Sequence, residues 1–395
     1  MGGVPGARRV VVPRVTPAVT RDAPGASGPR LLLNAEPFGF GPAAAVAILA
    51  TELAPACAQL DYLGGGHTLD VQRRPPFHTV HAVTDPADDG ALDALFASLA
   101  PRYDLFVTAV DFAMAGRALA AGLPVAIYDA LAWYWPTVPE VAHRAALYLA
   151  QDFFGVRERL ADDPALRART VVVPPLAPPR RDRKPGRHVL VNLGGLQHPV
   201  WAPDDAVAYA RLMLAAVRAG TPPGRRITVA TSRGIARALD DPDVGTYDHD
   251  TVLDLMSTAT YACMTSGLGN IYDAAAPGVP TLWPPPANDS QAEQIDLLDA
   301  AGHCDARLDW ADLGLPVAYG PSIPDLTRAI DRAVREAATG HPPAGALARL
   351  VADRTAGPGA REGRARALAE RFGHGGMRHA ARAVLRWCAA NRRAP

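Results

Sequence analysis

The residues best suited to chemistry stand in one segment of the second half of the chain, where small residues, carboxylates and an amide follow one another. A predicted strand ends at Met264 and is followed by a glycine-containing loop and then by a helix that starts near Asn270. Unpaired N–H groups and the positive dipole end of a helix bind phosphate oxygens, and glycine lets the backbone approach a ligand closely. The segment therefore predicts a diphosphate site formed by Thr265, Ser266, Gly267, Leu268, Gly269 and Asn270.

Polar side chains beyond this loop are spaced to contact the rest of a nucleotide. Asp273 stands in the first turn of the predicted helix, where its carboxylate can accept hydrogen bonds from two ribose hydroxyls. Residues 278–280 turn the chain into the next strand, and Asp289 and Gln291 follow the carboxyl end of that strand. Ligands of open α/β sheets bind at this end. Glycines that only form tight turns are the alternative, but the ordered series favours a nucleotide-sugar site.

A second set of candidate residues lies near the N-terminus. Glu36 follows a predicted strand and stands beside two glycines, a position suited to a general base, with a helix cap or a solvated carboxylate as the alternative. Asp111 and Asp129 end two further predicted strands, where an aspartate either contacts substrate or caps the next helix. We predict Glu36 and Asp111 as catalytic residues, with further ligand contacts from Phe38, Gly39, Phe40, Gly41, Asp129 and Trp133.

Aromatic residues and loop histidines add weaker candidates. Trp133-Tyr134-Trp135 is unusual in a chain with 6% aromatic residues. Three adjacent aromatics cannot share one face, so some can line the site of a planar acceptor, and packing at a domain interface is the alternative. His67 and His198 lie in predicted loops, where exposure to solvent is the ordinary outcome for a histidine.

These candidates are far apart in the sequence, and the hydrophobic pattern predicts the scaffold that brings them together. Continuous apolar strands alternate with helices, which indicates parallel sheets covered on both faces. The expected strands are residues 30–34, 103–110, 124–128, 188–192, 227–230, 261–264 and 279–283. Residues 174–187 combine prolines with a basic run and predict a semi-rigid connector. We therefore predict an α/β protein with a flexible leader (1–29), a first α/β domain (30–173), a linker (174–187), a second α/β domain (188–359) and a C-terminal helical segment (360–395), which is helical from 360 to 391.

Length and composition limit the classes of function. At 395 residues the chain exceeds the size at which one core keeps growing. Its 40 basic and 40 acidic residues exclude binding of nucleic acid or membrane by overall charge, so an anionic ligand must be held by local geometry. The four scattered cysteines predict free thiols rather than a zinc site. No apolar run reaches the ~20 residues of a membrane span, and we expect a cytoplasmic protein, with a homodimer left open.

The segment from Met264 to Gln291 resembles the donor-binding half of GT-B glycosyltransferases, especially the MurG-like branch and its relatives in antibiotic pathways. The resemblance implies two Rossmann-like domains facing across a cleft, with a C-terminal helix crossing back. It implies an inverting transfer from a UDP-sugar to a small acceptor, without a metal. It makes residues 30–173 the acceptor domain, with an acceptor site at Phe38, Gly39, Phe40, Gly41, Asp129 and Trp133, and it makes residues 188–359 the donor domain. It places residues 265–270 at the diphosphate, Asp273 at the ribose in place of a longer glutamate, and Asp289 and Gln291 at the transferred sugar.

One other segment extends this resemblance, and another departs from it. Residues 192–198 look like the glycine turn that opens the second domain of the family, which would bring Gly194 and Gly195 to the diphosphate from the other side. The N-terminal loop departs from the MurG branch because it lacks the Gly-Gly-His pattern, and this puts a lipid-linked acceptor in doubt.

Residues 34–42 and 148–156, with the aromatic run between them, look like the cytosylglucuronate synthases of peptidyl-nucleoside antibiotic pathways. This narrower resemblance implies UDP-glucuronate as the donor, cytosine or hydroxymethylcytosine as the acceptor, and bond formation at N1. A cation must then meet the glucuronate carboxylate, and Arg233 is one candidate, with an ordinary surface arginine as the alternative. No acidic pair stands in a convincing metal-binding position, since residues 248–250 are expected to cap a helix.

Four alternatives accompany this interpretation. A glycosyltransferase with another natural-product acceptor keeps both the fold and the chemistry. A nucleotide-sugar 2-epimerase would need a denser set of catalytic acids, and a non-catalytic partner of another enzyme would have a degenerate donor loop. A dinucleotide oxidoreductase is disfavoured because the N-terminal loop lacks the third glycine and no acid ends a strand ~20 residues later.

Overall fold

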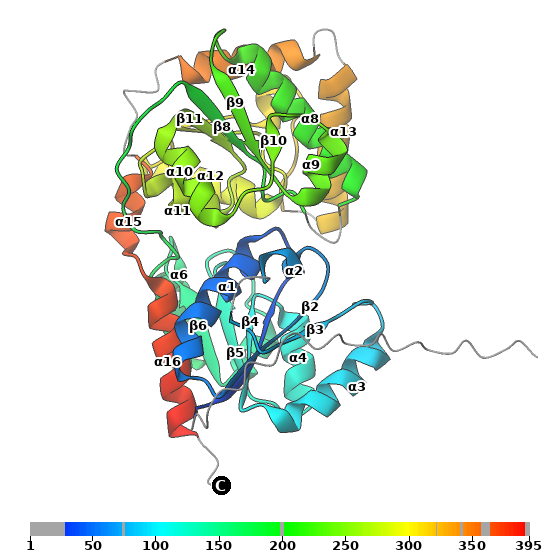
Figure 1. The fold of residues 1–395 in the computed structure, drawn as a ribbon, viewed down its shortest axis with the longest axis vertical. Helices are drawn as coiled ribbons and strands as arrows, with labels where there is room; N and C mark the ends of the chain where they lie inside the picture. Colours follow the sequence, from blue (N-terminus) through cyan, green and yellow to red (C-terminus); the bar gives the residue numbers. More distant parts are fainter. Residues whose placement is uncertain are drawn as a thin grey trace, which may run out of the picture.

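Two parallel sheets, one above the other in Figure 1, divide the chain in the computed structural model. The structure describes residues 28–72, 76–197, 201–320, 322–339, 343–356 and 364–391. Of the predicted leader only Gly28 and Pro29 are described, and His198 lies outside the described residues.

The first sheet has seven parallel strands in the order β3-β2-β1-β4-β5-β6-β7. Its strands are β1 (Arg30–Ala35), β2 (Gln59–Gly64), β3 (Thr79–Ala82), β4 (Leu105–Ala109), β5 (Val125–Asp129), β6 (Leu147–Gln151) and β7 (Thr170–Val173). The helices between them are α1 (Gly41–Leu53), α2 (Thr68–Val71), α3 (Asp89–Leu99), α4 (Phe112–Ala120), α5 (Glu140–Arg144), α6 (Val156–Asp162) and α7 (Pro164–Arg167), with 3-10 turns at Ala54–Ala56 and Ala100–Arg102. The strand order reverses between β1 and β4, and ligands of such sheets bind at that point, beyond the carboxyl ends of the strands.

The second sheet repeats this topology in the order β10-β9-β8-β11-β12-β13. Its strands are β8 (His188–Asn192), β9 (Arg226–Ala230), β10 (Val244–Gly245), β11 (Ala259–Met264), β12 (Thr281–Trp283) and β13 (Ala306–Arg307). The helices are α8 (Pro203–Gly220), α9 (Arg233–Leu239), α10 (His249–Thr258), α11 (Leu268–Ala275), α12 (Asp289–Ala300), α13 (Ile323–Thr339) and α14 (Pro343–Thr355), with a 3-10 turn at Trp310–Leu313. Here the order reverses between β8 and β11, so each domain has one expected ligand position.

The central strands are buried on both faces, which explains their continuous apolar sequences. In β1, Leu31 and Leu33 pack on one side of the sheet, while Leu32 packs on the other with Phe106. Each of these side chains is fully buried. Helices on both faces of a parallel sheet require this pattern, and every strand predicted from the sequence coincides with a strand of one of the sheets.

The prediction of one long C-terminal helix is wrong. The chain forms two helices, α15 (Arg366–Phe372) and α16 (Gly376–Ala390). Gly373 and Gly375 separate them with φ angles of +82° and +77°, a conformation that glycine adopts at little cost and that ends the first helix.

The C-terminal chain nevertheless crosses back to the first domain, as predicted. Helix α16 lies along α1 (Figure 1), where Met377, Ala380 and Val384 are buried against the outer face of the first sheet. Helix α15 packs on α11 of the second domain, and Phe372 at its end contacts Phe153 of the first. The two domains are therefore joined by this segment as well as by residues 174–187.

The connector at residues 174–187 is held along the second domain. The backbone N–H groups of Arg181 and Lys184 donate to the carbonyl oxygens of Ala276 and Ser257 at 3.0 and 2.9 Å.

Within the described residues, no helix is both long enough and apolar enough to cross a membrane.

Candidate active site between the two domains

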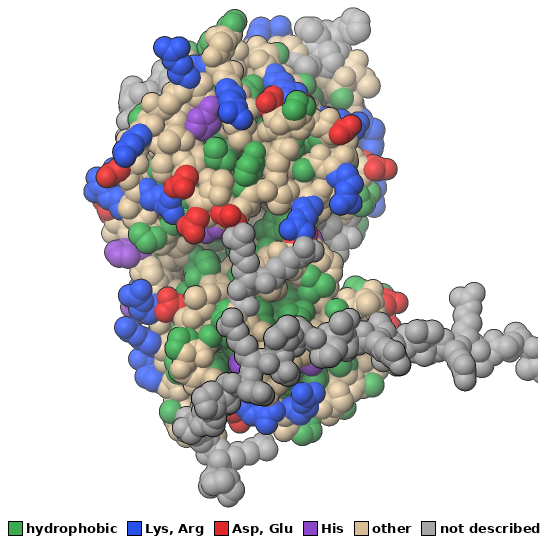
Figure 2. Space-filling view, viewed as in Figure 1, with side chains coloured by type: hydrophobic (Ala, Val, Ile, Leu, Met, Phe, Trp, Pro, Cys, Tyr) green, Lys and Arg blue, Asp and Glu red, His purple; other side chains and the backbone are tan. Residues whose placement is uncertain are grey.

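The glycine loops after β1 and β8 meet across the boundary between the domains, where Figure 2 shows a hollow with hydrophobic side chains gathered around it. The N–H of Gly39 donates to the carbonyl oxygen of Gln197 at 2.5 Å. A Cβ added to Gly39 would lie 3.7 Å from the Cα of Gly195. A Cβ added to Gly195 would in turn lie 3.2 Å from Thr265 Oγ1 and 3.5 Å from Gln291 Nε2. The loops at both switch points therefore converge on one place.

The predicted diphosphate loop begins its helix earlier than expected. Helix α11 starts at Leu268, with Gly267 as an extended N-cap residue, rather than near Asn270. Glycine is an acceptable N-cap residue, and it leaves the first N–H groups of the helix without a side-chain acceptor. This correction moves Asp273 from the first turn to the second, and it leaves the N–H groups of residues 268–270 available to an anion.

Side chains on either side of the loop fix its shape. Asn192, at the end of β8, donates to Asn270 Oδ1 at 3.0 Å and accepts from the N–H of Gly194 at 3.1 Å. Asn270 donates to the carbonyl oxygen of Thr265 at 2.8 Å. Ser266 Oγ donates to the carbonyl oxygen of Gln291 at 3.2 Å. These hydrogen bonds connect the loop to the end of β8 and to α12 and hold its shape before a ligand arrives.

Asp273, the predicted ribose ligand, is paired with a histidine that the sequence did not indicate. His249 Nε2 lies 2.9 and 3.0 Å from the two carboxylate oxygens of Asp273. Hydrogen bonding to Asp273 raises the pKa of His249. Asp248 caps α10 by accepting from the N–H of Thr251 at 2.9 Å, as predicted for residues 248–250. The cap places His249 in the first turn, facing α11.

Asp289 and Gln291 both lie in the first turn of α12, which Asn288 caps by accepting from the N–H of Gln291. Gln291 is buried, and its Oε1 accepts from the N–H of Ala287 at 3.0 Å, which directs its Nε2 toward Gly195. Asp289 accepts a hydrogen bond from the hydroxyl of Tyr134, which belongs to the first domain. Both predicted sugar ligands therefore face the boundary between the domains.

The predicted catalytic residues Glu36 and Asp111 are brought together beyond the carboxyl ends of β1 and β4. Their side chains share a hydrogen bond, and burial together with the Asp111 charge raises the pKa of Glu36 to about 8. Burial also raises the pKa of Asp111, although the N–H of Met114 donates to its Oδ1 at 2.9 Å. Asp111 thus caps α4, which was one of the alternatives for this residue, and it also contacts Glu36, while its catalytic role stays a prediction.

Backbone strain marks the same place. Val110 has a φ of +64°, a value that a β-branched residue rarely adopts. A strained backbone conformation persists only where the surrounding structure stabilises it, and such conformations are common at functional sites. Here it directs Asp111 from the end of β4 toward Glu36.

Other predicted residues of the N-terminal loop support its shape. The His67 Nε2–H donates to the carbonyl oxygen of Gly39 at 2.7 Å, and the His67 ring contacts Phe40 edge-on. Phe40 is the N-cap residue of α1 and Gly41 its first residue, while Phe38 is half-buried in the loop. His67 is therefore a support for the loop rather than an exposed residue.

Two predicted acceptor ligands are used in the protein interior instead. Asp129 is fully buried, and its carboxylate accepts from Leu131 N–H, Trp135 Nε1 and Tyr148 Oη at 2.6, 2.8 and 2.5 Å. Trp133 is 5% exposed and packs on Phe153 in the core. Both side chains are engaged within the first domain in this structure, and their contact with an acceptor stays a prediction.

Arg233, predicted to meet a glucuronate carboxylate, lies at the edge of the boundary. It is the first residue of α9, and its guanidinium is 3.4 Å from Asp70 of the first domain. Its side chain is 48% exposed, so a ligand can reach it by competing with a weak surface ion pair.

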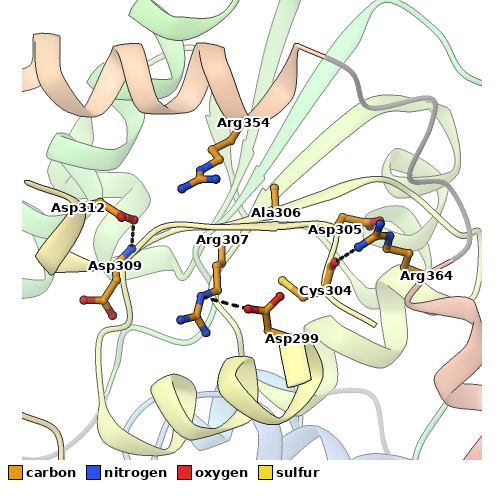
Figure 3. Close-up of a pocket in the computed structure, with 9 residues that line it drawn as sticks. All are labelled: Asp299, Cys304, Asp305, Ala306, Arg307, Asp309, Asp312, Arg354 and Arg364. Carbon is orange, nitrogen blue, oxygen red and sulfur yellow. Dashed lines mark hydrogen bonds and ion pairs between the residues drawn. The ribbon is translucent and has the colours of Figure 1, made fainter. Parts of the chain in front are cut away.

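A cavity of about 400 Å³ lies elsewhere, along the edge strand β13 (Figure 3). Arginines and aspartates line it, and several already have partners. Arg307 faces Asp299, Arg364 donates to the carbonyl oxygen of Cys304, and Asp312 accepts from the N–H of Asp309. None of the predicted site residues lines this cavity. The described residues also contain no group of three or more histidine, cysteine or acidic side chains arranged to hold a metal ion.

Three residues of the site were absent from our predictions. His249 and Asn192 contact residues far along the chain, so no local pattern identifies them. Tyr134 was part of the aromatic run, but the sequence did not show which of the three rings crosses to the other domain. The sequence signal for Tyr134 as a site residue was its position between two tryptophans.

Comparison with solved structures identifies the fold. The chain is similar over 91% of its length to Arabidopsis thaliana UGT89C1 complexed with UDP-L-rhamnose, covering 99% of that chain with a TM-score of 0.51 and 13% sequence identity. It is also similar to CalG4, the calicheamicin glycosyltransferase, over 93% of this chain and 100% of that one, with a TM-score of 0.49 and 15% identity. The similarity to the glycotransferase of kitacinnamycin covers 91% of this chain and 99% of that one, with a TM-score of 0.49 and 15% identity. No protein-family model matches the sequence, and no curated protein matches it. At these identities the similarity establishes the fold, and the predicted two-domain GT-B architecture is confirmed.

Proposed function

We propose that the protein is a glycosyltransferase that moves a sugar from a nucleotide donor to a small acceptor. One observation carries the proposal: the loops at the switch points of both sheets meet, with Gly39 against Gly195 and Gly195 against Thr265. In this proposal the carboxyl pair of the first domain faces the second domain's loop, which binds the diphosphate. A base opposite a leaving diphosphate is the arrangement that group transfer between two substrates needs.

In this proposal the second domain binds the donor. The N–H groups at the start of α11 and the loop hydroxyls of Thr265 and Ser266 receive the diphosphate, and Gly194 and Gly195 approach it from β8. Asp273, supported by His249, accepts hydrogen bonds from the ribose, while Asp289 and Gln291 take the sugar. Helix ends and oriented amides stabilise the charge that develops on the leaving group, so we propose that no metal is needed.

Glu36 acts as the base on the acceptor. Its pKa of about 8 lies close to neutral pH, which suits a group that must take a proton and later release it. Asp111 positions Glu36 through the hydrogen bond between them. Attack on the anomeric carbon from the side opposite the diphosphate then inverts the configuration of that carbon.

The more specific proposal is UDP-glucuronate as the donor and cytosine or hydroxymethylcytosine as the acceptor. Its support is the resemblance of residues 34–42 and 148–156 to cytosylglucuronate synthases. Arg233 is available at the edge of the boundary to meet the glucuronate carboxylate by exchanging Asp70 for the ligand. A protein of this fold has been solved with UDP-L-rhamnose, which makes UDP-sugars the first donor class to test.

The experiment is to incubate the protein with UDP-glucuronate and cytosine in EDTA and to follow UDP release and the new glycoside by mass spectrometry. We expect a product with the mass of cytosylglucuronate, and none with the Glu36→Gln variant. UDP release with other natural-product acceptors but not with cytosine would retain the glycosyltransferase and reject the specific substrates. Binding of UDP-glucuronate without turnover of any acceptor would favour a non-catalytic partner protein.

A further inference from the structure

Tyr134 is the one member of the aromatic run that reaches the other domain, and its neighbours hold it in place. Trp133 donates through Nε1 to the carbonyl oxygen of Ala130 at 3.2 Å, and Trp135 donates to Asp129 at 2.8 Å. Arg159 donates to the carbonyl oxygen of Trp133 at 3.1 Å. With both flanking residues fixed, the direction of the Tyr134 side chain is set by the first domain before any ligand binds.

The Tyr134 hydroxyl donates its hydrogen to Asp289 Oδ2, and the N–H of Ser290 donates to Asp289 Oδ1 at 2.8 Å. Each carboxylate oxygen has a further lone pair, and the phenol oxygen keeps its own lone pairs once its hydrogen is engaged. The two side chains therefore present two acceptors next to each other. Two neighbouring hydroxyl groups of a sugar are the donors that match this pair.

The position of the pair agrees with this ligand. Asp289 is in the first turn of α12, two residues before Gln291, which faces Gly195 in the converging glycine loops. Burial and the adjacent Asp289 carboxylate raise the pKa of Tyr134, so its hydroxyl keeps its hydrogen throughout the neutral range. The hydroxyl is thus a stable donor to Asp289 and a stable acceptor from a ligand.

We propose that Tyr134, from the first domain, and Asp289, from the second, together bind a pair of neighbouring hydroxyl groups on the donor sugar, so that both domains determine donor specificity. This inference rests on the proposed function and deepens it. It adds a specificity residue from the domain that was expected to contact only the acceptor. The site for the sugar is then complete only while the two domains hold their contact.

The test compares Tyr134→Phe with the unmodified protein in calorimetric titrations with UDP, UDP-glucose and UDP-glucuronate. The substitution removes one hydroxyl and keeps the ring. We expect unchanged affinity for UDP and a loss of about tenfold to a hundredfold for the UDP-sugars that the unmodified protein binds. Tyr319→Phe is the matched control, because the Tyr319 hydroxyl also contacts an aspartate, Asp309 at 3.5 Å, within the second domain. Tyr319→Phe should change neither the affinity for UDP nor the affinity for the UDP-sugars.

A double variant separates a shared interaction from two independent ones. If Tyr134 and Asp289 bind the same hydroxyl pair, Tyr134→Phe in an Asp289→Ala background adds little further loss. Equal weakening of UDP and UDP-sugars by Tyr134→Phe would show that Tyr134 acts on the arrangement of the domains, and would overturn the inference. Unchanged UDP-sugar affinity would overturn it as well, while leaving the proposed function standing. Absence of UDP-sugar binding in the unmodified protein would reject the proposed function and this inference together.

Discussion

The contact between Glu36 and Asp111 makes the stability of the protein depend on pH in a defined direction. The pKa of Glu36 is raised from 4.5 to about 8 in the folded state, first by burial and then by the Asp111 charge. Between these two values the folded protein holds a proton that the unfolded chain has lost. Linkage then requires that stability falls as the pH rises through this window. Below pH 4.5 this loss of stability is absent, and above pH 8 it is complete.

The size of the effect follows from the same shift. Each pH unit within the window costs at most about 1.4 kcal/mol of unfolding free energy. Glu36 is only partly buried, so solvent screening reduces the total, and we expect a loss of about 2 kcal/mol between pH 5 and pH 8.5. Glu36→Gln keeps the shape and a hydrogen-bond donor toward Asp111 but carries no titrating group. The variant should therefore be about 2 kcal/mol more stable than the unmodified protein at pH 8.5 and nearly equal to it at pH 5.

Urea denaturation at the two pH values measures this difference directly. Asp111→Asn is the companion variant, because asparagine can still cap α4 at Met114 while the charge is removed. It should lower the Glu36 pKa without restoring the ordinary value, since burial remains the larger cause. In turnover, the rate should rise with pH up to about 8, and Asp111→Asn should move the midpoint to lower pH. Parallel stability curves for the unmodified protein and Glu36→Gln would refute this reasoning.

Three other substitutions test separate parts of the structure. His249→Ala should weaken UDP binding about tenfold, and the effect should be larger at pH 6 than at pH 8.5. The reason is that the pKa of His249 is raised by its pairing with Asp273, and this pairing is strongest when the histidine is protonated. Calorimetry at both pH values would show an equal effect if the charge of the histidine does not matter. Gly195→Ala adds a methyl group 3.2 Å from Thr265 Oγ1 and should reduce UDP affinity at least about tenfold, whereas Gly116→Ala, with open space in α4, should leave it unchanged. Met377→Ala should destabilise the protein by about 2–4 kcal/mol in urea denaturation if α16 completes the first core, and the exposed Arg382→Ala should be nearly neutral.

The elements and the converging loops could be predicted from sequence because they follow from local rules. Apolar runs such as that of β1 indicate strands buried on both faces, and residues after such strands gather at one edge of a sheet. This is why Glu36 and Asp111, 75 residues apart in the chain, were correctly expected at the same edge. The glycine loops at Gly39 and Gly195 were placed by the same rule.

The side-chain partners could not be predicted, since they depend on how helices pack. Local pattern does not reveal which of three adjacent aromatics turns inward, and Trp133 does so while Tyr134 crosses to Asp289. Asp129 stands at a strand end like Asp111, but its carboxylate accepts a hydrogen bond from the neighbouring Trp135 instead of contacting Glu36. The break before α16 did have a local signal in its glycines, which the helical composition of the surrounding residues obscured.

Binding of a nucleotide sugar by the second domain, at the loop from Thr265 to Asn270 and without a metal, is the basis of the proposed function. Calorimetric titration of the protein with UDP, UDP-glucuronate, UDP-glucose and UDP-N-acetylglucosamine in EDTA, repeated with Asp273→Ala and Gly195→Ala, measures this binding. We predict binding of UDP and of at least one UDP-sugar, weakened in both variants, with UDP-glucuronate bound most tightly. Failure to bind any of these compounds, or binding that neither variant weakens, would contradict the account.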